Sequence, residues 1–81
     1  MTLDLSTCRK VAGIKQTMRA LREHRAEKLY IACDADPIVL GAIETMAQQQ
    51  ALPADRSATM AQLGQAAGIA VGAAVIAVLK K

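Results

Sequence analysis

Four polar residues near the start of the chain, Lys15, Gln16, Arg19 and Arg22, have types and spacing that suit anion recognition. On a helix, Lys15, Arg19 and Arg22 form one basic stripe, because they recur at intervals of four and three residues. Gln16 adds an amide that can donate and accept hydrogen bonds. Gly13 allows the N–H groups at a helix start to approach an anion closely. Together these groups could hold phosphates and contact exposed edges of nucleobases.

Charge is unevenly distributed along the chain. Arg9 to Lys28 holds seven Lys/Arg against two Glu, a balance of +5, whereas Leu29 to Leu79 holds one Arg against four acids, a balance of −3. The first of these segments is therefore suited to an anionic partner such as RNA or an anionic surface. By itself, a basic stripe of this length is more often a solvated helix face, here partly neutralised by Glu23 and Glu27.

The composition indicates one domain, residues 1–81, with a core of small aliphatic side chains. Of the 81 residues 53% are hydrophobic, but there is no Phe or Trp and Tyr30 is the only aromatic residue. This argues against folds that stack RNA bases on aromatic platforms. Cys8 and Cys33 show neither zinc-site nor disulfide spacing, which favours a reduced, cytoplasmic protein. The N-terminus does not resemble a secretory signal.

Two helices and a strand are expected in the first part of the chain. Apolar residues at helical intervals predict a short helix from Asp4 to Val11, ending near Gly13. The basic stripe belongs to a second, amphipathic helix from Lys15 to about His24. The apolar run Leu29–Cys33 predicts a buried strand.

The remaining elements are predicted from caps, glycines and apolar runs. Asp36 is expected to cap a helix that begins at Pro37, continues to 48–50 and buries Ile38, Val39, Leu40, Ile43, Met46 and Ala47. A short edge strand is expected at Leu52–Arg56, because Pro53 cannot lie in a central strand. Thr59 and Gln62 form a capping box for a helix that Gly68 ends, and Gly72 to Leu79 is expected to be a central strand. The element order predicts an α/β fold with helices on both faces of a small sheet.

Two other interpretations are weaker. Gly64, Gly68 and Gly72 lie at the spacing of packed transmembrane helices, but the apolar run Ala66–Leu79 is shorter than the roughly 20 residues that a membrane span needs. Asp34 and Asp36 follow a strand, where an enzyme could place a metal-binding or nucleophilic carboxylate. However, Asp36 already serves as a cap, and nothing nearby completes a catalytic site.

Catalysis is therefore not expected. His24 stands alone on the basic helix without a nucleophile in a recognisable motif, so we interpret it as a solvated residue. We expect no enzymatic activity, no metal and no cofactor.

Three motifs in order carry a resemblance over essentially the whole chain. They are Gly13-x-Lys15-Gln16-x-x-Arg19, Ala32-x-Asp34-x-Asp36-Pro37 and Leu63-Gly64-x-Ala66-x-Gly68-Ile69-x-Val71. The chain resembles the ribosomal protein L-seven-Ae/L-thirty-e family, in particular its small bacterial members that bind kink-turn RNA. The resemblance implies a three-layer α/β/α sandwich with a small mixed four-stranded sheet. It also implies binding to the sharply bent RNA motif built on tandem sheared G·A pairs.

The resemblance also implies which residues contact RNA. Lys15 and Gln16 would contact the guanines of the G·A pairs, and Arg19 the backbone or a base. The apolar loop from Gly68 to Val71 would cover an extruded nucleotide. The full implied set is Gly13, Ile14, Lys15, Gln16, Arg19, Asp36, Gly68, Ile69, Ala70 and Val71. The chain departs from the family at Gln62 and Gln65, where Lys or Arg is frequent, and at Ala70, where an acidic residue or Pro is frequent.

Three hypotheses follow from these observations. The first is a monomeric kink-turn RNA-binding protein that acts on ribosomal or regulatory RNA, with the ribosome as a candidate partner, and not at a membrane. The second is an assembly module whose basic helix meets an acidic protein. The third is a family member that has lost RNA affinity through the changes at Gln62, Gln65 and Ala70.

Overall fold

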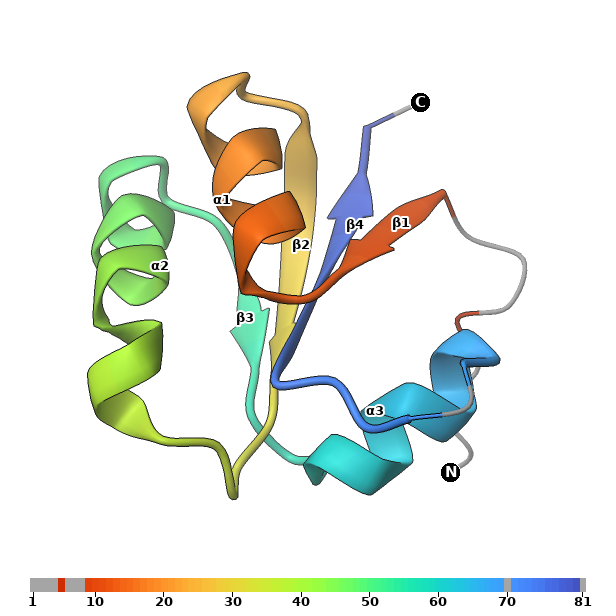
Figure 1. The fold of residues 1–81 in the computed structure, drawn as a ribbon. Helices are drawn as coiled ribbons and strands as arrows, with labels where there is room; N and C mark the ends of the chain where they lie inside the picture. Colours follow the sequence, from red (N-terminus) through yellow and green to blue (C-terminus); the bar gives the residue numbers. More distant parts are fainter. Residues whose placement is uncertain (1–4, 6–8, 70, 81) are drawn as a thin grey trace.

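The structure, a computed structural model, describes Leu5, residues 9–69 and residues 71–80. The described residues form four strands and three helices that alternate along the chain (Figure 1). In order these are β1 (Lys10–Ala12), α1 (Ile14–Arg22), β2 (Ala26–Ile31), α2 (Pro37–Gln49), β3 (Ala54–Asp55), α3 (Met60–Ala67) and β4 (Val75–Leu79).

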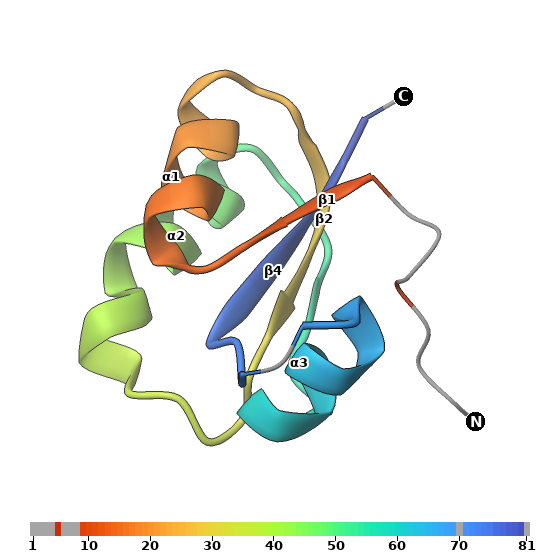
Figure 2. The ribbon, with the colours of Figure 1, turned by 45° about the vertical axis from the view of Figure 1, so that its right-hand side comes forward.

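The strands form one mixed sheet in the order β1-β4-β2-β3. β4 is antiparallel to both neighbours, pairing Ile76 with Ala12 and Val75 with Ile31. β3 is a parallel edge strand beside β2. Helices α1 and α2 cover one face and α3 lies against the other (Figures 1 and 2). The predicted α/β/α sandwich with a mixed four-stranded sheet is confirmed.

The alternation of side chains along the strands creates two cores. On the face of α1 and α2, Leu21, Leu29 and Ile43 are fully buried with Val75. On the other face, Ile76 packs with Leu63 of α3. Because β4 is central, its apolar residues serve both faces, which explains why this strand lacks polar side chains.

The strand directions bring three segments to one end of the sheet. β1 and β2 end where β4 begins, because β4 runs antiparallel to both. The starts of α1 and α2, which follow β1 and β2, therefore lie at the same end as the loop that enters β4 (Figure 1). This topology, rather than any local motif, assembles the region described below.

The predicted helix from Asp4 to Val11 is wrong where it can be compared with the structure. Lys10 to Ala12 form strand β1, paired with Val78, Ala77 and Ile76 of β4. Backbone pairing with a central strand gives this segment more hydrogen-bond partners than one isolated helical turn would. Asp4 and residues 6–8 lie outside the described residues.

Smaller corrections concern element boundaries and burial. The strand predicted at Leu29–Cys33 spans Ala26–Ile31, and the one predicted from Gly72 begins at Val75. In α2, Leu40, Ile43 and Ala47 are buried as expected. Ile38 and Val39 are instead 88% and 49% exposed. Leu40 in the same turn is buried with Ile43 and Ala47, so Ile38 and Val39 are exposed because they lie off the buried stripe of α2.

The glycine series is explained by a close contact between α3 and the loop that follows it. A Cβ on Gly64 would lie 2.3 Å from the Val71 carbonyl oxygen, and a Cβ on Gly72 would lie 3.2 Å from the Met60 carbonyl oxygen. Gly68 ends α3 in the left-handed conformation, with φ of 75°. The spacing therefore reflects a chain that folds back on its own helix. None of the described helices is long and apolar enough to cross a membrane.

Candidate nucleic-acid interface

The start of α1 leaves its first backbone donors without a side-chain cap. Gly13 is the N-cap residue, with φ of 94°, and no side chain accepts a hydrogen bond from the first turn. The Gly13 N–H itself donates to the carbonyl of Val75, 2.9 Å away, which fixes the helix start to the sheet. In contrast, α2 and α3 are capped by Asp36 and Thr59. The start of α1 is therefore a fixed positive helix end that remains available to an anion.

The first turns of α1 divide into an anchoring side and a solvent side. Thr17, Ala20 and Leu21 are buried, and Ile14 packs partly buried against the core. Lys15, Gln16 and Arg19 are exposed on the solvent side. We call Gly13, Lys15, Gln16 and Arg19 the basic end. Ile14 contributes its backbone N–H to this region, while its side chain is used for packing.

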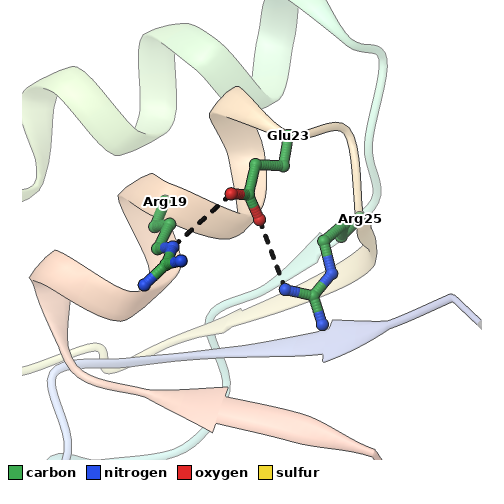
Figure 3. Close-up of polar contacts among 3 residues, drawn as sticks. All are labelled: Arg19, Glu23 and Arg25. Carbon is green, nitrogen blue, oxygen red and sulfur yellow. Dashed lines mark hydrogen bonds and ion pairs between the residues drawn. The ribbon is translucent and has the colours of Figure 1, made fainter.

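An open hollow of about 540 Å³ adjoins the basic end. It is lined by Lys15 and Arg19 of the basic end and by Arg22 and Glu23. Glu23 accepts from Arg19 Nε at 3.4 Å and from Arg25 Nη1 at 3.3 Å (Figure 3). The Arg25 guanidinium, with a smaller contribution from Arg19, holds the pKa of the Glu23 carboxyl below its usual value. Arg19 is nevertheless 72% exposed, and exposed pairs of this length contribute little. Arg19 can therefore leave Glu23 for a phosphate at small cost.

A second feature, an apolar hollow of about 280 Å³, lies between the start of α2 and the start of α3. We call it the apolar corner; Ala35, Asp36, Val39, Leu40, Met60 and Ala74 line it. Asp36 is exposed there, and its Oδ1 accepts from the Ile38 N–H at 2.9 Å. An apolar hollow with one carboxylate at its rim suits a flat, partly polar group such as a nucleobase.

Three hydrogen bonds that involve backbone atoms hold the segments of the apolar corner together. Asp34 Oδ1 accepts from the Met60 N–H at 2.8 Å, which ties the loop after β2 to the start of α3. The Ala73 N–H donates to the Met60 carbonyl at 3.1 Å. The Ala32 N–H donates to the Ala74 carbonyl at 2.9 Å. Three segments distant in sequence are therefore fixed around one hollow. The capping box of α3 is formed as predicted, with Thr59 Oγ1 accepting from Gln62 N.

The loop after α3 flanks the corner. Ile69 is 38% exposed and Val71 is 73% exposed, so neither is a core residue. Exposed apolar side chains of this size in one loop indicate a contact surface. Gly68 fixes the start of the loop, and Gly64 allows it to lie against α3. Ala70 lies outside the described residues.

The structure brings most of the expected site residues to one end of the sheet, in the two regions just described. It adds residues that the sequence did not indicate as contacts: Val39, Leu40, Met60 and Ala74 line the apolar corner, and Asp34 anchors it. The helical spacing predicts both Val39 and Leu40 in the core; this holds for Leu40, which is buried and also lines the corner, but not for Val39. No local pattern identifies Met60 or Asp34, since their roles depend on a contact between segments 26 residues apart.

Two relatives are similar in sequence to this chain over most of its length. An RNA-binding protein of Geobacillus sp. (strain WCH70) is 37% identical over 76 residues, which cover 94% of this chain and 93% of the relative. An RNA-binding protein of Halalkalibacterium halodurans is 41% identical over 70 residues, covering 86% of this chain and 85% of the relative.

Solved structures share the fold at lower identity. The 15.5kD RNA binding protein of Giardia lamblia superposes with a TM-score of 0.81 at 23% identity, covering 90% of this chain and 62% of that chain. A protein of unknown function from Bacillus halodurans superposes with a TM-score of 0.80 at 18% identity, covering 89% of this chain and 72% of that one.

A model of one protein family matches residues 4–81. Together with the two relatives at 37% and 41% identity, this match extends the resemblance seen in the three motifs to nearly the whole chain. The chain belongs to the ribosomal protein L7Ae/L30e/S12e/Gadd45 family.

Proposed function

We propose that this chain is a non-enzymatic RNA-binding protein that recognises and stabilises kink-turn RNA. The observation that carries the proposal is the position of the basic end and the apolar corner at one end of the sheet. One region offers free backbone donors, Lys15, Gln16 and Arg19, and the other offers an apolar hollow beside an exposed loop. A bent RNA with an extruded nucleotide presents both partners, a phosphate backbone with exposed base edges and an unstacked base.

In this mechanism each region has a separate task. Lys15 and Gln16 hydrogen bond to the guanine edges of the sheared G·A pairs. Arg19 exchanges its weak contact with Glu23 for a phosphate or a base. The extruded nucleotide enters the apolar corner, with Asp36 at its rim, and is flanked by Ile69 and Val71. We propose Ala70, which lies outside the described residues, as a further contact. Because only the bent RNA can reach both regions together, binding shifts a flexible RNA toward the bent form.

Relatives named as RNA-binding proteins support RNA as the partner, and ribosomal or regulatory RNA is the proposed source of the motif. The direct test is a bending assay, in which fluorophores on the two arms of a kink-turn RNA report their distance during titration with protein. We expect the arms to approach each other. A control RNA with its G·A pairs changed to Watson–Crick pairs should bind far more weakly. Equal binding to both RNAs would refute kink-turn recognition.

A second candidate function is protein assembly, and the exposure of Ile38 and Val71 favours it. In that case the basic end would meet an acidic protein, and the exposed apolar side chains would dock on it. Absorbance of the freshly purified protein distinguishes the two. Tyr30 is the only aromatic residue, so bound RNA would dominate the spectrum at 260 nm. A protein that purifies free of nucleic acid and does not bend a kink-turn RNA would favour assembly.

A further inference from the structure

The sheet carries a second group of cations, on the face away from α1. Lys10 of β1 and Lys28 of β2 both lie opposite Val78 of β4. Directly paired residues point to the same side of a sheet, so these three side chains share one face. The next set of paired residues on the same face, two positions along each strand, is Ala12, Ile76 and Tyr30. These three belong to the core beside α3. The two lysines therefore lie on the α3 face.

None of the helices in the described residues covers this part of the α3 face. α3 lies at the end of the sheet where β4 begins, whereas Lys10 and Lys28 lie toward the end where β4 finishes (Figures 1 and 2). Lys10, Lys28 and Val78 are accordingly only half-buried. Lys80 is exposed and follows Val78 by two residues, which continues the alternation on the same face. We call Lys10, Lys28 and Lys80 the lysine face.

Two of the three lysines lie on either side of one strand. Neighbouring strands are about 4.8 Å apart, so the Cα atoms of Lys10 and Lys28, which flank β4, are about 10 Å apart. This is close to the screening length at physiological salt, about 8 Å. Among the described residues, the ion pairs involve Arg19, Arg25 and Arg56 and none of the three lysines. The lysine face therefore gathers three positive charges that form no ion pair within the described part of the chain.

Two carboxylates lie beside this face and reduce its charge in part. Glu27 is exposed in the bulge next to Lys28. Hydrogen bonds from Ser57, with a smaller contribution from the Lys28 charge, lower the pKa of the Asp55 carboxyl. Asp55 of β3 lies opposite Tyr30, two positions along β2 from Lys28. Its Oδ1 accepts from the Ser57 N–H at 2.8 Å and from the Ser57 hydroxyl at 2.6 Å. The Lys28 ammonium lies over the Tyr30 ring, 4.7 Å from the ring centroid. The ring attracts the ammonium group without neutralising its charge.

We propose that the lysine face binds the phosphate backbone of a second RNA segment, so that the protein can join two parts of an RNA or two RNAs. It lies at the opposite end of the sheet from the start of α1 and on the other face. An RNA seated on the basic end therefore approaches from the other face of the sheet. Among the described residues, Val78 is the large apolar side chain that lies between Lys10 and Lys28, which is too little for a protein hot spot. Phosphate binding, in contrast, requires mainly positive charge.

The test uses protein already saturated with unlabelled kink-turn RNA. A labelled RNA duplex of about 12 base pairs without G·A pairs is then added, and its anisotropy is measured from about 50 to 200 mM salt. We expect a second binding event that weakens with salt. Changing Lys10→Gln, Lys28→Gln and Lys80→Gln together should lower duplex affinity about tenfold and reduce the slope of log affinity against log salt by about 2. Kink-turn affinity should stay within about twofold, since no lysine of this face touches the basic end.

A matched variant separates charge from other effects. Lys10→Arg, Lys28→Arg and Lys80→Arg keep the three charges and should retain duplex binding. If the kink-turn RNA itself does not bind, the test is repeated with Lys15→Gln, Arg19→Gln and Arg22→Gln as background, which removes α1 as a competing site. The experiment therefore distinguishes a protein that does not recognise kink-turn RNA from a lysine face that does not bind the duplex. No duplex binding, duplex binding unchanged by the glutamine variant, or binding of polyglutamate in place of RNA would each overturn the proposal.

Discussion

The basic end and the apolar corner lie at the same end of the sheet, but they are held in opposite ways. The basic end belongs to one helix, its side chains extend into solvent, and its first N–H groups have no cap. The corner combines the loop after β2, the start of α2, the start of α3 and the entry to β4. Its backbone donors at Met60 and Ala73 are already paired within the protein.

Because of this difference, substitutions in the two regions should affect RNA affinity and folding stability differently. Substitutions on the solvent side of α1 should change RNA affinity and leave stability almost unchanged. Substitutions that disturb the corner should change stability as well, because the contacts that shape the hollow also hold the chain together. Each of the following changes tests whether the two regions are independent in this way.

The largest effect on binding is expected from Lys15→Ala with Gln16→Ala. Each lost base contact should cost about 1–3 kcal/mol of binding free energy, taking the magnitude known for DNA. The midpoint of urea unfolding should not change, because both side chains are exposed. Filter binding with kink-turn RNA measures the affinity.

Gln48→Ala with Gln49→Ala is the matched control, since these exposed residues lie at the far end of α2. It should bind kink-turn RNA as the parent does. A comparable loss in both pairs would mean that the basic end has no special role.

Gly64→Ala should impair both regions. Its Cβ would lie 2.3 Å from the Val71 carbonyl oxygen, so the loop after α3 must move. We expect the free energy of unfolding to fall by about 1–3 kcal/mol and kink-turn binding to weaken through the displaced loop. Urea unfolding and the bending assay measure the two effects.

The control for this change is Gly41→Ala in α2, where a Cβ meets nothing within 4 Å. Since alanine favours helix, this variant should gain about 0.5–1 kcal/mol and bind normally. If Gly64→Ala behaved like Gly41→Ala, the close approach of loop and helix would be unimportant.

Asp34→Ala removes the acceptor for the Met60 N–H and should have a moderate effect. The capping box of Thr59 and Gln62 remains, so α3 should persist and the loss should be about 1 kcal/mol of stability. Asp34→Asn keeps an acceptor oxygen and should lose less. Comparison of the two variants by thermal unfolding tests the anchor; equal losses would point to the charge rather than the hydrogen bond.

The smallest effect concerns the titration of Glu23. Its pKa lies below the usual value chiefly because of Arg25, so Arg25→Gln should raise it more than Arg19→Gln does. A lowered pKa means that the contribution of the pair to stability is present above the unfolded-state pKa. It is lost as the pH falls through the folded-state pKa.

A carboxyl NMR titration measures the pKa of Glu23 in each variant. Because Glu23 is exposed, the associated change in stability should be slight. A pKa at its usual value in the unmodified protein would show that Figure 3 does not describe the pairs present in solution.

Sequence analysis located the features that depend on neighbouring residues. The caps at Asp36 and Thr59 and the left-handed end at Gly68 were predicted because each is set within four residues. The prediction failed where pairing across the sheet decided the outcome. Val11 continues the helical spacing of Leu3, Leu5 and Cys8, yet Lys10 to Ala12 pair with strand β4.

The sequence by itself determined the cluster of cations before Leu29, the glycine that opens α1 and the family to which the chain belongs. Only the tertiary structure decided that Ile38 and Val39 are exposed, that Asp34 anchors Met60, and that lysines 18 residues apart in sequence, Lys10 and Lys28, flank one strand. The physical reason is the range of the interactions involved. Capping and helical amphipathicity act within one or two turns, whereas burial, strand register and charge clustering depend on which distant segments the sheet brings together.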